Sequence, residues 1–322
     1  MKDLLKILFF SLILIHHSVI KAQQAIQFSQ YIFSGLSLNP GYAGYKENLN
    51  LNMTYRSQWT GLSGAPATLS VSVDGVSKNK SLGFGFSVLQ DNLGPQSTLS
   101  ALVSFAYRLK LSINSRLSFG VTSGIDQYKL DNSKLITIDP EQNIGSLVTT
   151  KVRPDLQFGL FFASEHFFTG ISATDLLAGF NNFDPTYLVI KREKYFYFHL
   201  GGIFPLNSSI SLKPSFLIKE DFKAPANLDL NTFLIFNNKF WLGLSLRTAF
   251  NAFNSKFLQT NLNSSDAASI MVEYFPNRSL RIGYSFDYTT SPLQQVSSGS
   301  HEISLGYIFH TPNYPMLSPR LF

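Results

Sequence analysis

Most of the chain alternates apolar and polar residues with a period of two. Residues 116–126 are typical: Leu117, Phe119, Val121 and Ile125 fall on one face of an extended strand, and small or polar side chains fall on the other. This alternation indicates β-strands with one apolar face and one polar face rather than helices.

The same pattern predicts about fourteen strands, many of them nine or more residues long. We place them at 47–57, 65–75, 81–91, 98–111, 114–128, 153–164, 166–174, 195–205, 209–220, 226–236, 239–250, 267–276, 279–289 and 300–310. Short and long connections alternate over most of the chain. An even number of long strands with short turns on one side and longer loops on the other is typical of bacterial outer-membrane barrels.

Composition favours the membrane barrel over its main rival, a soluble β-sandwich or propeller. Charged residues make up 14% of the 322 residues, against about 25% in soluble domains, while aromatic residues also reach 14%. Beyond residue 20 the chain lacks the run of about 18 apolar residues that a spanning helix requires. The strands also exceed the usual length of about 5–6 residues in soluble sheets. We therefore predict an all-β fold: an antiparallel up-and-down outer-membrane β-barrel.

The N-terminus has the features of an export signal. Lys2 and Lys6 precede an apolar stretch from Ile7 to Ile15, and Ala22 is a small residue before a plausible cleavage point. The predicted organisation is a signal peptide at 1–22, a periplasmic or lumenal segment at 23–46, the barrel at 47–310 and a periplasmic tail at 311–322. The chain has no cysteine, which excludes disulfides.

A net charge of +6 does not indicate nucleic-acid binding. The basic residues are scattered along the chain, and the densest group, at 191–194, contains an acid. The expected surroundings of the barrel are outer-membrane lipids.

Several short motifs, in order, resemble the PorP/SprF family of outer-membrane proteins from the type IX secretion and gliding systems of Bacteroidetes. The resemblance covers nearly all of the chain after the signal peptide. It is carried by QFSQY at 27–31, LNPGYAG at 38–44, YRSQWTG at 55–61, GAP at 64–66, Asp91 with Gly94 and Pro95, AYR at 106–108, Pro154-Asp155, LKPS at 212–215, FWLG at 240–243, LRIGYS at 280–285 and SGSHE at 298–302.

This resemblance implies a role in protein secretion rather than a reaction. Members of the family are needed for export or surface retention of a partner, often a secreted adhesin, and are thought to act through protein contacts. The implied partners are a type IX substrate and possibly components of the translocon. A passive porin or solute-transporting barrel is the alternative, because composition and periodicity do not separate the two functions.

Two groups of motif residues are candidates for partner binding, each with a simpler structural interpretation. Gln58, Trp59 and Gly61 end the first strand on the outer side, where Trp also suits a membrane interface. Gly64 and Pro66 lead into the return strand.

Asn39 and Pro40 form the second group. They begin a turn ahead of the first strand, because Pro fixes φ and the following Gly tolerates positive φ.

Charged residues on the polar strand faces are expected to point into the lumen, since they would be costly in lipid. The candidates for a lumenal charge network are Arg56, Arg108, Arg281, Asp287 and Glu302. A structural ion-pair network and a selectivity ring for solutes are both compatible with the sequence.

The sequence lacks the common motifs of enzymes and metal sites. The chain contains no nucleophile elbow, phosphate-binding loop, zinc-protease helix or EF-hand pattern, and its histidines are well separated. We therefore predict no catalytic residues, no metal site and no cofactor.

Overall fold

The computed structural model describes residues 26–134, 148–178, 193–250 and 265–310. The predicted signal peptide at 1–22 and the predicted tail at 311–322 lie outside the described residues. The described part begins with three short helices: η1 (Tyr31–Phe33), α2 (Gly35–Leu38) and η2 (Pro40–Tyr42). None of the helices in these ranges has the length and apolar character of a membrane span.

The rest of the described chain is almost entirely strand. The strands are β1 (Leu49–Ser57), β2 (Ala67–Val76), β3 (Leu82–Leu93), β4 (Gln96–Lys110), β5 (Arg116–Asp131), β6 (Val148–Ala163), β7 (Phe167–Thr174), β8 (Tyr195–Gly202), β9 (Phe204–Pro205), β10 (Ile210–Glu220), β11 (Ala226–Phe236), β12 (Phe240–Phe250), β13 (Ser265–Tyr274), β14 (Leu280–Thr289) and β15 (Ser300–Phe309). Two further 3₁₀ turns, η3 (Asn132–Lys134) and η4 (Pro292–Gln295), lie in connections.

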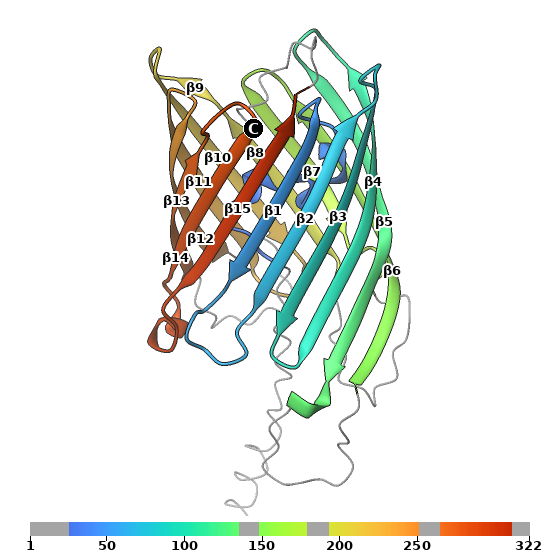
Figure 1. Ribbon diagram of the computed structural model, residues 1–322, viewed down its shortest axis with the longest axis vertical. Helices are drawn as coiled ribbons and strands as arrows, with labels where there is room; N and C mark the ends of the chain where they lie inside the picture. The colour runs from blue at the N-terminus through green and yellow to red at the C-terminus, as the bar shows by residue number, and fades with distance from the viewer. Residues whose placement is uncertain (1–25, 135–147, 179–192, 251–264, 311–322) are drawn as a thin grey trace, which may run out of the picture.

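These strands close into one antiparallel barrel (Figure 1). Each strand pairs with its neighbour along the chain, and β15 pairs with β1 from Leu49↔Phe309 to Ser57↔His301. The two-residue β9 follows β8 after Ile203 and pairs with the same strand, β10, so the described wall has fourteen strands. The predicted fold class is confirmed. Closure gives each strand a neighbour on both sides, as backbone groups in a bilayer require.

The two rims of the barrel differ in their connections. The tight-turn rim carries the connections 77–81, 111–115, 164–166, 206–209, 237–239 and 275–279, and the long-loop rim carries 58–66, 94–95, 132–147, 175–194, 221–225, 251–264 and 290–299. In outer-membrane barrels the longer loops face outward and the short turns face the periplasm.

One stretch of wall extends farther than the sequence predicted. We expected a strand to end at 128 and the next to begin at 153, but β5 and β6 remain paired as far as Asp131↔Val148. The additional pairs lie next to the long connection 132–147, toward the long-loop rim. We attribute the missed residues to their position beyond the apolar band, where the two faces of a strand no longer need opposite polarity.

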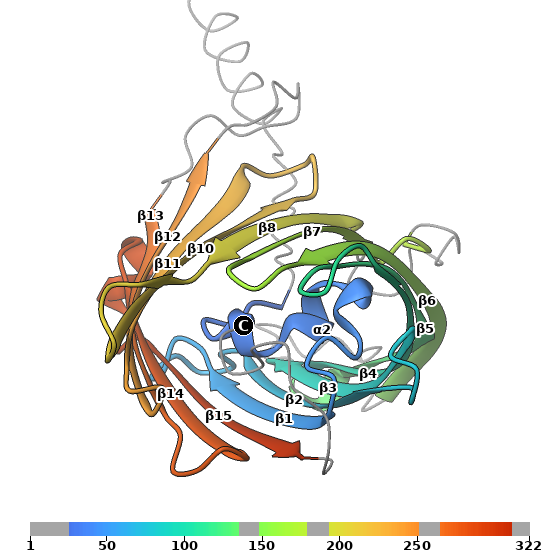
Figure 2. The same cartoon turned by 90° about the horizontal axis from the view of Figure 1, so that it is seen from above.

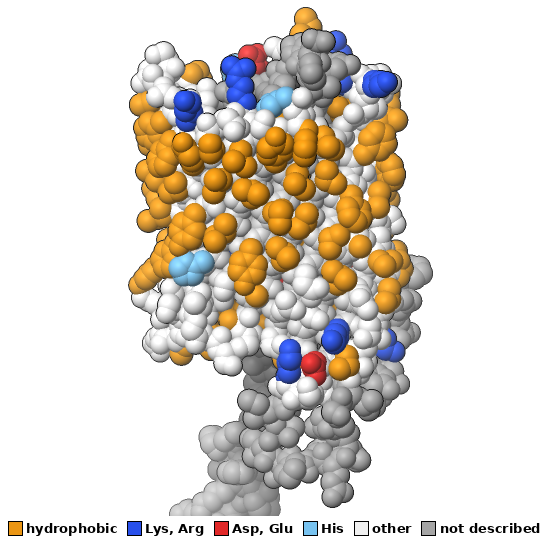
Figure 3. Space-filling model, in the orientation of Figure 1, with side chains coloured by type: hydrophobic (Ala, Val, Ile, Leu, Met, Phe, Trp, Pro, Cys, Tyr) orange, Lys and Arg blue, Asp and Glu red, His pale blue; other side chains and the backbone are white. Residues whose placement is uncertain are grey.

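The strand faces divide as the alternation requires. In β4, Phe105 and Tyr107 point outward and are more than half exposed, whereas Ser104, Ala106 and Arg108 point inward and are buried. Exposed apolar side chains form a belt around the visible wall, with charged side chains gathered toward the two rims (Figure 3). The outer face is therefore suited to lipid, and the inner face is small and polar.

The lumen is occupied by the N-terminal segment that precedes β1. The three short helices lie inside the ring of strands when the barrel is seen along its axis (Figure 2). We call residues Gln27–Glu47 the plug. The main apolar cluster of the described chain lies where the plug meets the wall, with Phe28, Tyr31 and Phe33 from the plug packed with wall residues such as Phe233 and Trp241.

The assignment of faces can be tested at Leu305, which points outward in the middle of β15 and is 40% exposed. Leu305→Arg should destabilise the barrel by about 2–4 kcal/mol if the residue lies near the midplane of the bilayer. Leu305→Met preserves an apolar side chain and serves as the control. The measurement is the free energy of unfolding by urea in lipid vesicles; equal values for the two variants would contradict the assigned face.

Candidate functional site: the plugged lumen and its long-loop rim

The plug crosses the lumen from one rim toward the other. At its start, the Gln27 amide donates to Asn227 and Asp229, near the end of β11 that adjoins the long-loop rim, at 3.4 and 3.5 Å. At its end, the Glu47 carboxylate accepts from Lys80, in the tight turn after β2, at 2.7 Å. The chain therefore runs from the long-loop rim to the tight-turn rim before it turns into β1.

Phe33 is the aromatic anchor of the plug. Its ring centroid lies 5.9 Å from that of Phe233 and 5.4 Å from that of Trp241. The Arg281 guanidinium lies over the same ring at 4.2 Å, and the Lys213 ammonium lies 5.5 Å from it. Cations over an aromatic face are attracted by its quadrupole, more strongly when both are desolvated. Apolar and cationic side chains of the wall therefore pack around Phe33 and hold the plug in place.

The candidate residues Asn39 and Pro40 lie inside the lumen and fix the turn of the plug. The Asn39 carboxamide donates to the carbonyls of Leu160 and Ile171 at 2.9 and 3.2 Å and accepts from the Gly41 amide at 2.8 Å. It therefore caps η2, which begins with Pro40, while bonding to strands β6 and β7. These contacts support the structural interpretation of the turn.

Glycine in the wall makes room for this turn. A Cβ at Gly120 of β5 would lie 2.1 Å from both the Gly41 nitrogen and the Pro40 carbonyl carbon. A Cβ at Gly159 of β6 would lie 2.1 Å from the Asn39 side-chain oxygen. Backbone can approach backbone this closely only where the side chain is absent.

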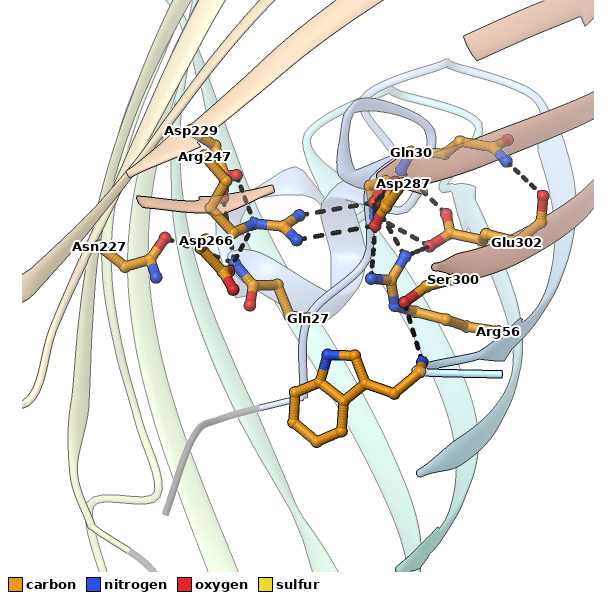
Figure 4. A network of polar contacts seen from close by, with 12 residues as sticks. Gln27, Gln30, Arg56, Asn227, Asp229, Arg247, Asp266, Asp287, Ser300 and Glu302 are labelled. Carbon is orange, nitrogen blue, oxygen red and sulfur yellow. Dashed lines mark hydrogen bonds and ion pairs between the residues drawn. The ribbon is translucent and has the colours of Figure 1, made fainter. Parts of the chain in front are cut away.

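Three of the five predicted charge-network residues meet at the closing pair of strands, β1 and β15, and the adjacent β14 (Figure 4). The Arg56 guanidinium contacts Asp287 at 2.6 Å and Glu302 at 3.0 Å, and all three side chains are at most 2% exposed. The Glu302 carboxylate also accepts the backbone amides of Ser29 and Gln30 at 2.8 and 2.9 Å. We call these five residues the seam cluster.

The seam cluster joins wall to plug through charge-assisted hydrogen bonds. The Ser29 hydroxyl donates to Asp287 and accepts from Arg56 at 2.8 Å. Arg247 extends the network, with its guanidinium 2.7 Å from Asp229 and 3.7 Å from Asp287. Bonds of this kind are stronger than neutral ones, and each buried charge here has a partner.

The other two predicted charges belong to separate contacts. Arg281 pairs with Glu273 at 2.6 Å and donates to Ser304 at 2.7 Å, and Ser304 in turn bonds to Gln30 of the plug. Arg108 pairs with Glu47 at 3.2 Å. Their partners, Glu47 and Glu273, were not predicted from the sequence. Glu273 falls on the inward positions of its strand, so the alternation could have identified it.

Ionisation of two plug residues follows from this environment. Burial, followed by repulsion from Arg281, lowers the pKa of Lys46 to about 8. Burial alone would raise the pKa of Glu47, but its contacts with Lys80, Arg116 and Arg108 hold the pKa below the ordinary value. Glu47 is therefore ionised at neutral pH and can bind several cations at once.

The remaining motif residues lie at the long-loop rim, in the connection between β1 and β2. The Gln58 amide donates to the Pro66 carbonyl at 2.9 Å, which closes this loop just before β2. The Trp59 amide donates to the Ser300 hydroxyl at 3.1 Å, and Trp59 is half-buried.

Glycines connect the same loop to its neighbours. The Gly94 amide donates to the Gly64 carbonyl at 2.9 Å, which ties the loop to the turn after β3. Gly61, with φ of +95°, follows Thr60, whose backbone exchanges two hydrogen bonds with Ser298 and Gly299. The motif residues therefore lie in two places. One group is at the long-loop rim, and the other is the Asn39 turn inside the lumen.

Three buried carboxylates also gather on the lumenal side of the wall. Ligand oxygens of Asp126, Asp155 and Asp175 lie within 4.8 Å of one another. Ser100 donates to Asp126 at 2.5 Å and Gln157 donates to Asp155 at 2.6 Å. Carboxylates can bind hard cations, but each of these three groups already has a partner within the protein, and the arrangement does not by itself specify a metal.

Comparison with solved structures found other β-barrels of outer membranes. The CymD monoaromatic hydrocarbon channel has a TM-score of 0.51 and 11% identity, with 86% of this chain and 93% of that chain covered. A Pseudomonas aeruginosa FadL homologue has a TM-score of 0.46 and 12% identity, covering 84% and 93%. Acinetobacter baumannii Omp33 has a TM-score of 0.45 and 9% identity, covering 82% and 100%. At such identities the likeness concerns the fold alone.

Two sequence comparisons complete these findings. Curated protein sequences gave no match. A family model described as "Type IX secretion system membrane protein PorP/SprF" matches residues 20–307.

The seam cluster should dominate the stability of the plugged barrel. Arg56→Gln leaves Asp287 and Glu302 buried without their shared cation and should cost about 3–5 kcal/mol. The double variant Arg56→Gln with Glu302→Gln removes one of the two carboxylates that have lost Arg56. It should recover part of the lost stability. Urea unfolding in vesicles measures both variants. A single variant as stable as the unaltered protein would contradict the role given to Arg56.

The fit of the plug can be tested at Gly120. Gly120→Ala should displace the turn at Asn39 and loosen the plug, because the new methyl group would overlap the backbone of Pro40 and Gly41. The readouts are higher single-channel conductance in planar bilayers and tryptic cleavage after Lys46, which is buried in the intact plug. Gly75→Ala, whose new Cβ would lie 3.4 Å from Leu49, is the matched control. Identical conductance and cleavage in both variants would argue against a tightly seated plug.

Proposed function

Because the chain belongs to the PorP/SprF family of type IX secretion system membrane proteins, we propose that it is the outer-membrane partner of a secreted protein, such as an adhesin, which it helps to export or retains at the cell surface. The barrel lies in the outer membrane. We propose a non-enzymatic role through protein contacts, with the substrate and possibly translocon components as partners.

The plug is the observation that carries this proposal. An open porin needs a water-filled lumen, whereas this lumen holds about twenty residues of the chain itself, fixed by Phe33, Asn39 and the seam cluster. A protein whose lumen is filled in this way offers its rims, rather than a pore, to other molecules. The alternative of a passive solute channel requires the plug to move or leave.

The long-loop rim supports a surface role. Gln58, Trp59, Gly61, Gly64 and Pro66 lie in a loop that is tied by backbone hydrogen bonds to the connections on either side. Preorganised loops bind partners with a smaller entropic cost than free ones. Trp59 is half-buried, and Trp is enriched among the residues that dominate binding energy.

The test is affinity purification of the tagged protein from detergent-solubilised outer membranes, with retained proteins identified by mass spectrometry. We expect one large secreted protein to be recovered. Trp59→Ala should reduce that recovery about tenfold or more if Trp59 is an interface hot spot. Ile113→Ala, at an exposed apolar residue of the opposite rim, should leave it unchanged.

The same material distinguishes the two functions. Recovery of the barrel alone, together with steady conductance in planar bilayers, would favour the solute channel. Equal loss of the partner in Trp59→Ala and Ile113→Ala would count against binding at the long-loop rim.

A further inference from the structure

Strand β6 is paired along its whole length on one side but not on the other. Strand β5 pairs with it at every position from 148 to 163, whereas β7 pairs with it only from 158 to 163. Among the described residues, no strand pairs with the β7 side of β6 from 148 to 155, and we call this stretch the open edge. The β5–β6 hairpin extends beyond its neighbours at the long-loop rim (Figure 1). Since unpaired backbone is not tolerated in hydrocarbon, this end of the hairpin lies outside it.

Hydrogen bonds farther along β6 fix which backbone groups face the open edge. The Leu156 carbonyl and the Ser164 amide both form hydrogen bonds on the β7 side of the strand. Backbone groups of successive residues point to alternate sides of an antiparallel strand. Even-numbered residues of β6 therefore direct their N–H and C=O toward the β7 side, and odd-numbered residues bond to β5. At the open edge, Thr150 and Val152 each present an N–H and a C=O with which no described strand pairs.

Two residues explain why the pairing with β7 stops where it does. Pro154 faces the open edge and has no N–H to donate. The Asp155 carboxylate accepts the Leu156 amide at 2.8 Å, so the next donor is already occupied. Proline within sheets is largely confined to edges and bulges. The Pro154-Asp155 motif therefore ends the pairing with β7 and leaves the preceding residues of β6 as an edge.

The side chains of the open edge suit an added strand. Val148 and Val152 point outward and are 48% and 58% exposed, with Thr150 between them on the same face. Such β-branched residues favour extended backbone. Lys151 is exposed on the other face, and Lys129, also exposed, lies opposite Thr150 on β5. These cations favour acidic side chains in a neighbouring segment.

An open strand edge specifies its ligand more narrowly than an apolar patch does. Its N–H and C=O groups, repeated at every second residue, are matched by another extended backbone. The open edge also lies at the long-loop rim, which carries the Trp59 loop. We propose that the secreted partner adds an extended segment to the open edge as a further β-strand, with acidic side chains beside Lys151 and Lys129. This inference rests on the proposed function.

The test uses the full-length barrel with its partner, recovered by affinity purification, and measures amide hydrogen exchange at single residues by mass spectrometry. Partner binding should slow exchange at Thr150 and Val152 about tenfold or more. The amides of Lys151 and Arg153, which face β5, should not change. This alternation distinguishes strand addition from a contact made by side chains alone. Fast exchange at Thr150 and Val152 in the complex would overturn the proposal. Slow exchange in the barrel without its partner would also overturn it, because the edge would then already be paired.

A backbone variant provides a second measurement. Val152→Pro removes a donor from the open edge and preserves the pairing with β5, because the Val152 N–H points away from β5. It should reduce recovery of the partner about tenfold. Val152→Ala keeps the backbone donor and is the matched control, with recovery close to that of the unaltered protein.

Failure of this inference is distinguishable from failure of the proposed function. If the unaltered protein recovers no secreted protein, the proposed function fails and the inference fails with it. If Val152→Pro recovers the partner as well as the unaltered protein does, the proposed function stands and binding at the open edge is excluded.

Discussion

The buried guanidinium of Arg56 holds together the two parts of this molecule. It lies on the first wall strand, contacts carboxylates on β14 and β15, and through Ser29 reaches the plug. A buried ion pair does not by its presence guarantee stability, because desolvation opposes the Coulomb attraction. Here the carboxylates also accept backbone amides and a hydroxyl from the plug, so the hydrogen bonding of these buried charges is complete only when wall and plug are both in place.

The inner face of the wall is shaped for its contents. Glycine at positions such as 120 and 159 allows the Asn39 turn to approach the strand backbone, while Phe233 and Trp241 surround Phe33. Close packing of this kind gives the plug one position rather than many. The small residues that would suit a wide channel in an empty barrel instead make room for a protein segment.

The wall was predictable from the sequence because its physical cause is local. A lipid-facing side chain and a lumen-facing side chain alternate along each strand, so residues such as Leu117 and Ser118 show the two faces directly. The pattern failed at 148–152, where the strand continues away from the apolar belt. Inward charges were also predictable, since Arg56 and Glu302 fall on polar faces.

The partners of those charges were not predictable, since they depend on strand register and on a segment far away in sequence. Arg56 and Glu302 become neighbours only because β1 meets β15, and Glu47 meets Arg108 only because the plug ends at the same rim. The sequence left open whether residues 23–46 lie in the periplasm or in the lumen. The alternation of apolar and polar residues gave no indication of the direction in which the plug runs through the barrel.

That direction has a consequence for the order of assembly. The wall closes by pairing β1 with β15, the strand pair that carries Arg56 and Glu302, and the plug is bonded to both residues. A segment seated against Gly120 and Gly159 and continuous with β1 cannot easily be threaded through a ring that has already shut. The last pairing step in biogenesis therefore has to enclose a plug that is already present, and the carboxylates and guanidinium of the seam cluster become neutralised at the same moment. Closure of the wall and burial of the N-terminal segment would then be a single event.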